Sequence, residues 1–368
     1  MSFYDEIKQY SWEEVEQSIL NKTEKDVLIA LNKERCNLED FKALISPAAE
    51  KYIEQMAAKA RQLTMSRFGK TIQMYVPLYV SNYCSNSCVY CGFSAKNKIV
   101  RKKLSINEVM QEIEVLKAWG FKHILLVSGE SNAKTNTDYY KEVIKAIRPH
   151  FSQISLEVQP LDTSDYKQLV DEGLRYVCVY QETYNEEAYP SFHPRGRKAD
   201  YKYRLETPDR CGQAGMDKIG IGALLGLQNW RTDSFFTALH LSYLEKTYWR
   251  TRYSISLPRL RPHVGSFNPE MPITDLQMAQ LICAYRLFNH EVDISLSTRE
   301  SSQFRDMAMH IGVTTMSAAS STEPGGYVKP NKELEQFSIN DGRSVDEMAD
   351  AVRKQGYEPV WKDWDTWL

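Results

Sequence analysis

The sequence predicts an α/β protein with a parallel (β/α)8 barrel of the TIM type, flanked by an N-terminal helical extension and a short C-terminal extension. Helical patterns alternate with apolar runs rich in β-branched and aromatic residues, which is typical of a parallel sheet. Eight such runs occur, at 71–80, 123–128, 154–158, 176–181, 218–222, 253–257, 292–296 and 312–316. Chemically reactive polar residues follow several runs directly, as they do in barrel enzymes. An open, doubly wound sheet is the competing architecture, because periodicity alone does not separate the two.

The first 70 residues show amphipathic helical patterns and no strand-like run. Ser11 and Glu14 have the spacing of a capping box, and Ser46 before Pro47 is a favourable helix start. We therefore expect residues 1–70 to form a helical extension that precedes the barrel.

The remaining boundaries follow from capping and composition. Ser105 and Glu108 form a capping box ahead of an amphipathic run inside the barrel region. After about residue 318 the sequence becomes rich in glycine and proline, and a short capped helix follows. We therefore expect the barrel to span residues 71–318 and residues 319–368 to form an extension packed on it.

Composition and charge exclude several classes of protein. The net charge of the 368-residue chain is −2 and its basic residues are dispersed, so we expect neither nucleic acid nor a membrane as a partner. No apolar run approaches the ~18 residues that span a bilayer, and the start lacks an apolar signal core. Seven cysteines, an odd number, do not indicate a disulfide framework. We expect a cytoplasmic protein.

Three cysteines, Cys84, Cys88 and Cys91, follow the first predicted strand with the spacing CxxxCxxC. Cysteine thiolates bind zinc or iron–sulfur clusters. A structural zinc site would need a fourth ligand from a second closely spaced pair, and the other cysteines are scattered. Three thiolates instead fit a [4Fe–4S] cluster whose fourth iron has no cysteine ligand. Three buried cysteines that only fill space are the structural alternative.

With Tyr90 before the third cysteine, the motif reads CxxxCxYC and resembles that of the radical S-adenosylmethionine (SAM) enzymes. The resemblance implies that SAM binds the open iron through its amino and carboxylate groups. It also implies that the reduced cluster cleaves SAM into methionine and a 5′-deoxyadenosyl radical. In such chemistry the protein contributes positioning and the exclusion of competing reactions.

Other segments resemble the parts of this superfamily that bind the amino acid end of SAM. Gly129 and Glu130, after the second strand, match the segment that receives the SAM ammonium group. Arg204 matches an arginine that pairs with the SAM carboxylate, a task that suits a fixed fork of donors. Arg210 is the alternative, although it could instead only support its helix.

The adenosine end of SAM is placed by the same resemblance. The segment KIGIGALLGL, which contains Ile221, matches a Gly-rich strand along the adenine, where a backbone without side chains admits a flat ring. Glu157, after the third strand, matches a position near the ribose hydroxyls, and a purely structural role is equally open.

Within the superfamily, the chain resembles the 2-iminoacetate synthase family, tyrosine lyases that supply the thiazole moiety of thiamine. The resemblance is carried by YVPLYVSNYCSNSCVYCGFS, EVQPL, VYQETYN, RLETPDR, DKIGIGALLGL, LPRLRP, LSTRES, PGGY and VWKDWD. It implies that hydrogen abstraction from the tyrosine amine leads to cleavage of the Cα–Cβ bond. The expected products are 2-iminoacetate and p-cresol, with methionine and 5′-deoxyadenosine as co-products.

The resemblance also implies roles for residues after the later strands. An arginine after the seventh strand matches the position that binds the substrate carboxylate, and two serines beside the eighth strand could donate to the same group. Residues after the fourth strand are candidates for handling the amine, and we expect Glu182 to orient it or accept its proton. The candidates are Arg299, Ser317 and Ser320 for substrate binding and Glu182, Gln181 and Tyr184 for catalysis.

Three other functions compete with this interpretation. They are the tyrosine lyase of [FeFe]-hydrogenase maturation, a radical enzyme with another substrate such as tryptophan or a flavin precursor, and a cluster-binding electron carrier. The maturase family holds a second cluster with cysteines near its C-terminus, and this chain has no cysteine after Cys283. The expected partners are L-tyrosine, thiazole synthase and a flavodoxin or ferredoxin as reductant.

Overall fold

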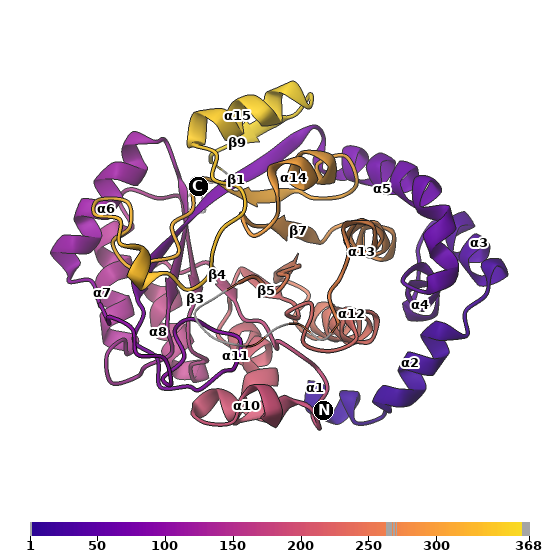
Figure 1. Cartoon of the computed structure of the whole chain (residues 1–368), viewed down its shortest axis with the longest axis horizontal. Coiled ribbons are helices and arrows are strands. Elements are labelled where there is room, and N and C mark those ends of the chain that lie inside the picture. The colour runs from indigo at the N-terminus through magenta and orange to yellow at the C-terminus, as the bar shows by residue number, and fades with distance from the viewer. Residues whose placement is uncertain (1, 263–266, 268, 270, 363–368) are drawn as a thin grey trace.

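Eight parallel strands close into a barrel in the computed structural model, which describes residues 2–262, 267, 269 and 271–362 (Figure 1). Each strand pairs in parallel with the next, and β1 pairs with both β2 and β8. The strands are β1 (Thr71–Ser81), β2 (His123–Ser128), β3 (Gln153–Glu157), β4 (Tyr176–Cys178), β5 (Lys218–Ile221), β6 (Arg252–Ser256), β7 (Asp293–Leu296) and β8 (Thr315–Ser317). The predicted barrel is confirmed, and closure excludes the open, doubly wound sheet.

Helices cover the outside of the barrel, and the helix start predicted at Ser105 carries its cap. The Ser105 side chain accepts from the backbone N–H of Glu108 at the start of α6, and Thr274 caps α13 in the same way. The helices between β1 and β8 are α6 (Ile106–Ala118), α7 (Thr137–Ile147), α8 (Thr163–Glu172), α9 (Tyr189–Phe192), α10 (Tyr201–Leu205), α11 (Thr207–Gln213), α12 (Trp230–Thr247), α13 (Asp275–Phe288) and α14 (Ser302–Ala308), with a 3-10 turn, η2 (Arg197–Ala199). None of the described helices is both long and apolar enough to cross a membrane.

The N-terminal helices form an arc beside α12 and α13, on the outside of the helical ring (Figure 1). They are α1 (Phe3–Ile7), α2 (Trp12–Leu20), α3 (Glu24–Asn32), α4 (Leu38–Leu44), η1 (Pro47–Tyr52) and α5 (Ile53–Phe68). Ser11 caps α2, and η1 begins directly after Ser46. The amide of Gln280 on α13 donates to the carbonyls of Leu44 and Ser46, which fixes the arc on the barrel wall.

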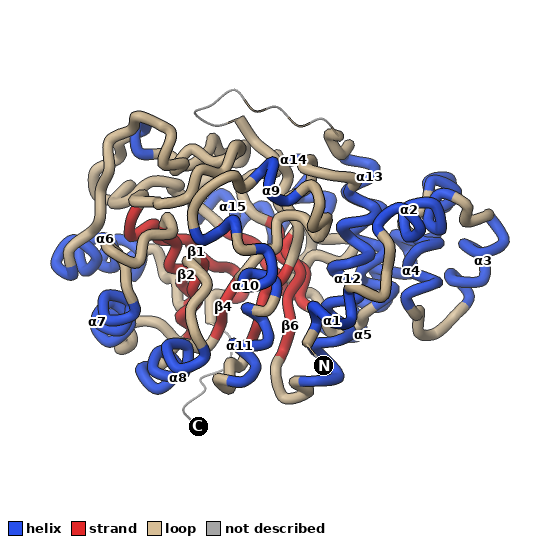
Figure 2. Tube along the Cα trace, turned by 90° about the horizontal axis from the view of Figure 1, so that it is seen from below, coloured by secondary structure: helices blue, strands red, loops and turns tan. Residues whose placement is uncertain are grey.

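The C-terminal segment contains η3 (Lys332–Leu334), α15 (Val345–Lys354) and a ninth strand, β9 (Glu358–Val360), which the sequence did not predict. The new strand extends the sheet outside the barrel by pairing in parallel with β1 at Thr71–Gln73. Loops gather at one end of the strands (Figure 2), and Thr322 and Gln336 of the C-terminal segment reach the cavity at that end.

Candidate active site

A large cavity opens at the carboxyl ends of the barrel strands. Its empty volume, including the open mouth, is about 1480 Å³. Residues that follow the strands line it, as sequence reasoning expected for a barrel enzyme.

The three cysteines of the motif lie on the loop after β1, and all three line this cavity as free thiols. The Arg101 guanidinium holds the loop by donating to the carbonyls of Asn82, Phe93, Ser94 and Asn97. Burial raises the pKa of the Cys84 thiol to about 11. A metal that replaces the proton is therefore needed to keep this buried sulfur as a thiolate.

The cysteine loop fits a cluster better than a single metal ion. Among the described residues, no three Cys, His, Asp or Glu side chains gather closely enough to hold one metal. A tetrahedral zinc site would need such a gathering. A [4Fe–4S] cluster places each cysteine on a different iron, so its three sulfurs stand apart around one cavity. Cys84, Cys88 and Cys91 all line one cavity, as such a cluster requires, and Cys178 of β4 is the one other cysteine among the described lining residues.

Four charged side chains form a buried network next to the cysteines. The Arg204 guanidinium lies 2.9 Å from the Glu130 carboxylate and 3.5 Å from that of Glu182. The Lys198 ammonium lies 2.6 Å from Glu182. Burial would raise the pKa of Glu182, but Lys198 and Arg204 outweigh it and hold that pKa below its usual value. Two cations and two anions therefore compensate each other out of contact with bulk water.

Local backbone geometry presents Glu182 to this network. The fourth strand ends at Cys178, three residues earlier than predicted, and the chain then turns into the barrel mouth. Glu182 has φ of 71°, a left-handed conformation that a non-glycine residue rarely adopts. A strained backbone conformation of this kind persists only where surrounding contacts enforce it. At Glu182, one such contact is the ion pair with Lys198.

Neighbouring polar groups hold the same end of the cavity in place. The Asn86 amide donates to Glu130 over 2.7 Å, and the Tyr90 hydroxyl shares a hydrogen bond of 2.7 Å with His193. A Cβ at Gly129 would lie 2.5 Å from the Tyr83 carbonyl, so the end of β2 packs directly on the cysteine loop. Glu130 and Tyr90 are thus fixed beside the cysteines.

Another part of the cavity wall presents an arginine without a carboxylate partner among the described residues. The Arg299 guanidinium stacks 3.5 Å from the Phe337 ring centroid and forms no ion pair with any described residue. Ser317 accepts from the backbone N–H of Thr298, whereas the buried Ser320 hydroxyl has no partner among the described residues. An anion entering here would find a cation and a free hydroxyl donor.

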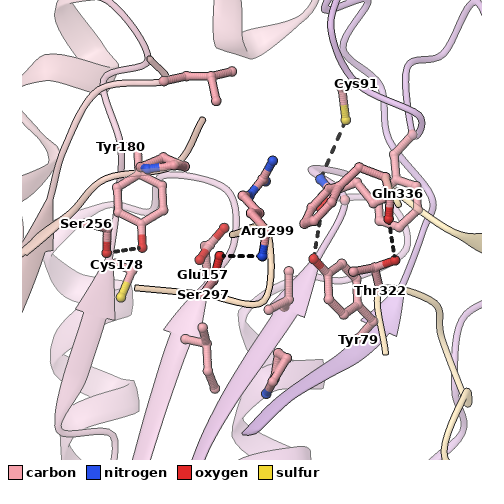
Figure 3. A pocket seen from close by; sticks show the side chains of 18 of the residues that line it. Tyr79, Cys91, Glu157, Cys178, Tyr180, Ser256, Ser297, Arg299, Thr322 and Gln336 are labelled. Atoms are coloured by element: carbon pink, nitrogen blue, oxygen red, sulfur yellow. Dashed lines mark hydrogen bonds between the residues drawn. The ribbon is translucent and has the colours of Figure 1, made fainter. Parts of the chain in front are cut away.

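Glu157 lies beside Arg299, at the end of β3 (Figure 3). Burial raises the pKa of Glu157 to about 7, although the charge of Arg299 opposes the rise. This carboxyl group therefore changes its protonation near neutral pH.

The structure brings most, but not all, of the predicted site residues to the cavity. The lining includes Cys84, Cys88, Tyr90, Cys91, Gly129, Glu130, Glu157, Glu182, Arg204, Arg299, Ser317 and Ser320. Four predicted residues do not line it: Gln181, Tyr184, Arg210 and Ile221.

These four side chains make other contacts. The Tyr184 hydroxyl bonds to His240, and the Gln181 amide bonds weakly to the Tyr201 carbonyl. Arg210 donates to the carbonyls of Leu161 and Tyr203, and so supports the α10–α11 region. Ile221 is buried in the hydrophobic core.

Several lining residues escaped sequence reasoning. Lys198, Gln336 and Phe337 belong to no recognised motif, and their chain segments meet the cavity only through the tertiary fold. Arg261 lies within the segment LPRLRP, but the sequence analysis gave it no role. Lys198 is the most informative of them, since it pairs with Glu182. The absence of any acidic residue in 189–199, a segment with three cations, is the one signal that could have drawn attention to it.

Comparison with known proteins places this site in a family. Residues 78–236 match the radical SAM superfamily, and residues 256–358 match the biotin and thiamin synthesis associated domain. The chain is 48% identical to 2-iminoacetate synthase of Escherichia coli (strain K12), over 100% of this chain and 98% of that protein. The same enzyme of Salmonella typhimurium is 47% identical over the same shares.

A solved structure supports the same fold. The crystal structure of HydG, a maturase of the [FeFe]-hydrogenase, superimposes with a TM-score of 0.90 at 32% identity, covering 95% of this chain and 80% of that one. The identity to this maturase is well below that to the two 2-iminoacetate synthases, which favours the latter as the functional relatives.

Proposed function

The chain belongs to the 2-iminoacetate synthase family of the radical SAM superfamily, and on this premise we propose how its own residues carry out the reaction. The protein is a carbon–carbon lyase that cleaves L-tyrosine into 2-iminoacetate and p-cresol for the thiazole moiety of thiamine. It uses a [4Fe–4S] cluster and SAM. The observation that carries the assignment of roles is that the cysteine loop, the charged network and the unpaired arginine share one cavity.

Cys84, Cys88 and Cys91 would hold the cluster, because they are the three free thiols of one loop on the cavity wall. When bound, the cluster and SAM supply a 5′-deoxyadenosyl radical, with methionine as the other product. The protein walls keep water away from this chemistry, since most side chains around the cysteines are buried or half-buried.

The network of Glu130 and Arg204 suits the amino acid end of SAM. A zwitterion brings one cation and one anion, so it can enter a neutral ion-pair network by exchange of partners without leaving a buried charge uncompensated. Glu130 would receive the ammonium group while keeping the amide of Asn86. Arg204 would receive the carboxylate while keeping the carbonyl of Tyr180.

The remaining SAM contacts are assigned from the family resemblance. Tyr90 and Gly129 line the cavity beside the cysteines, and Glu157 is available for the ribose. Ile221 and Arg210 do not line the cavity. Any role for them would be indirect, by fixing the positions of β5 and α11.

The substrate end suits the carboxylate of tyrosine. Arg299 provides a bidentate donor without a competing carboxylate, and Ser320 provides an unpartnered hydroxyl. Ser317 already accepts one hydrogen bond and can still donate its own hydroxyl hydrogen. We assign these three residues to substrate binding.

Glu182 is our candidate for the tyrosine amine. Its pKa is held below the usual value by Lys198 and Arg204, so it is ionised at neutral pH and can accept a hydrogen bond from an ammonium group. Gln181 and Tyr184 do not reach the cavity, and their contribution would be to hold the backbone around Glu182.

An anaerobic assay tests the function and the role of Glu182 together. The reconstituted enzyme is incubated with SAM, dithionite and tyrosine, and 5′-deoxyadenosine, p-cresol and glyoxylate, the hydrolysis product of 2-iminoacetate, are quantified. Glu182→Gln should still release 5′-deoxyadenosine but form little p-cresol. A wild-type yield of p-cresol in the variant would remove Glu182 from the mechanism, and no p-cresol from the wild type would remove the function.

The partners and organisation of the chain complete the proposal. We assign thiazole synthase as the acceptor of 2-iminoacetate and a flavodoxin or ferredoxin as the electron donor, with no nucleic acid or membrane partner. Cytoplasmic localisation is supported by seven cysteines that form no disulfide. We divide the chain into a helical extension (1–70), the radical SAM barrel (71–318) and a C-terminal extension (319–368), of which residues 363–368 lie outside the described part of the chain.

A further inference from the structure

The C-terminal extension places one side chain against a cysteine of the proposed cluster site. The Gln336 amide Nε2 donates to the Sγ of Cys91 over 3.6 Å (Figure 3). The Tyr79 hydroxyl, from β1, donates to the Oε1 of the same amide over 2.8 Å. Gln336 thus bridges the first barrel strand and the cysteine loop, although it lies about 245 residues from Cys91 in sequence.

Backbone contacts on both sides hold Gln336 at this place. Its N–H donates to the Thr322 carbonyl over 3.1 Å, and the Thr322 hydroxyl donates to the carbonyl of Phe337 over 2.9 Å. A Cβ at Gly92, next to Cys91, would collide with the carbonyl of Gln336. The extension therefore rests directly on the cysteine loop, and the amide is not a loosely held surface group.

The chemistry of the two partners fixes which end of the amide faces the sulfur. A thiolate bound to iron carries no hydrogen and can only accept a hydrogen bond. The amide must therefore direct its NH2 group to Cys91, and its oxygen then faces Tyr79. Tyr79 can supply the matching donor because burial raises the pKa of its hydroxyl well above the usual value.

We propose that Gln336 is a positioning residue that raises the reduction potential of the cluster by donating a hydrogen bond to the Cys91 thiolate. The proposal rests on the ligand role of Cys91 proposed above. Reduction adds one electron to the cluster, so the sulfur becomes a better acceptor and the donor stabilises the reduced form more than the oxidised form. The C-terminal extension thereby eases uptake of the electron that the flavodoxin or ferredoxin supplies.

The test measures the potential and not the turnover. Gln336→Leu removes the donor at similar volume, and the reconstituted variant is titrated anaerobically without SAM or tyrosine, with electron paramagnetic resonance reporting the reduced cluster. We expect the midpoint to move to more negative potential, by about a tenfold change in the one-electron equilibrium, or about 59 mV. Gln355→Leu, at the C-cap of α15, removes an amide bonded to His310; it is the matched control and should keep the wild-type potential.

A second variant keeps the proposal falsifiable if Gln336→Leu does not retain its cluster. Tyr79→Phe removes the hydroxyl that orients the amide, so it should shift the potential in the same direction by a smaller amount. A wild-type potential in Tyr79→Phe would then overturn the proposal. An unchanged potential in Gln336→Leu with full iron and sulfide content would overturn it as well. A full cluster in Cys91→Ala would instead overturn the ligand assignment, which separates the two failures.

Discussion

Arg204 and Arg299 line the same cavity, but the protein surrounds them differently. The Arg204 side chain is 6% exposed and lies between the carboxylates of Glu130 and Glu182. Arg299 is half-buried, stacks on the ring of Phe337, and meets no carboxylate within ion-pair distance among the described residues. Burying a cation without a nearby anion costs free energy. The protein offsets this cost at Arg204 with two carboxylates, and it leaves the cost without such compensation at Arg299.

This difference indicates how each end is completed. The charges around Arg204 sum to zero without a ligand. This part of the cavity suits a zwitterion, whose ammonium and carboxylate groups can replace partners in the existing ion pairs. Arg299 has no carboxylate within ion-pair distance among the described residues, and the carboxylate of an amino acid would supply one. Four variants, two of them with a matched control variant, test the comparison, because they should separate effects on folding from effects on binding.

Arg204→Ala should have the largest effect, since it leaves Glu130 without an ion-pair partner and removes one of two partners of Glu182. Breaking a buried pair on one side typically costs about 3–5 kcal/mol of the free energy of unfolding. We expect this loss in urea unfolding of the cluster-free protein, and loss of 5′-deoxyadenosine formation in the reconstituted enzyme.

Arg204→Lys is the matched control for this variant. A lysine restores the charge but cannot reach Glu130, Glu182 and the Tyr180 carbonyl with one planar group, so we expect partial recovery of stability and little recovery of activity. Wild-type stability of Arg204→Ala would show that the network is not compensated as described.

Arg299→Met should spare the fold and impair binding. The variant loses a cation–π contact worth about 1 kcal/mol, so the free energy of unfolding should change little. The tyrosine carboxylate loses its bidentate partner, and we expect KM for tyrosine to rise on the order of 100-fold. Kinetics of p-cresol formation measure this, with 5′-deoxyadenosine formation as the readout of the intact SAM end.

Arg261→Met provides the control, because Arg261 lines the same cavity and its buried Nε has no partner among the described residues. Its KM for tyrosine should stay within a few-fold of the wild type. A large rise in KM in Arg261→Met, with none in Arg299→Met, would transfer the substrate carboxylate to Arg261.

Glu157→Gln should alter the pH dependence of stability. Burial raises the pKa of Glu157 to about 7, above the value of about 4.3 for an unfolded glutamate. The folded state therefore binds the proton more tightly, and this stabilisation is fully present below about pH 4.3 and lost as pH rises through 7. The variant has no such loss, so its stability relative to the wild type should rise between pH 5 and pH 8, by at most about 3 kcal/mol.

Urea unfolding at several pH values measures this slope, and Arg299→Met sharpens the comparison. Because Arg299 lowers the pKa of Glu157, its removal should move the loss of stability to higher pH. Parallel pH profiles of wild type and Glu157→Gln would contradict the assignment of a neutral-range titration to this carboxyl group.

The barrel could be predicted closely from the sequence, because each strand is a local apolar run. The second strand, His123–Ser128, was predicted to the residue, and most others within one residue. The fourth ended early, since the run continues in sequence while the backbone turns to present Glu182. The ninth strand, Glu358–Val360, was missed because three residues that include a proline give no strand signal, and pairing with β1 alone defines it.

The candidate site divides in the same way. Cys84, Cys88 and Cys91 share one loop, so their spacing revealed them. Lys198 and Gln336 could not be predicted, because no spacing rule links either residue to its partner. Lys198 meets Glu182 from the segment after α9, 16 residues along the chain, and Gln336 meets Cys91 from the C-terminal extension, 245 residues away. Motifs record chemistry that one segment carries, whereas these two contacts exist only in the closed barrel.

Tyr184→Phe should have the smallest effect and tests where the catalytic site ends. The Tyr184 hydroxyl bonds to His240 at 3.1 Å, and its ring packs against Phe3 and Phe236, on the helix-facing side of the wall. Loss of one buried hydrogen bond should cost about 0.5–1.5 kcal/mol of the free energy of unfolding. Since the side chain does not line the cavity, KM for tyrosine and the ratio of p-cresol to 5′-deoxyadenosine should stay within twofold of the wild type. If the ratio of p-cresol to 5′-deoxyadenosine fell strongly while SAM cleavage was preserved, Tyr184 would act on the substrate. The catalytic site would then extend beyond Glu182 to include Tyr184.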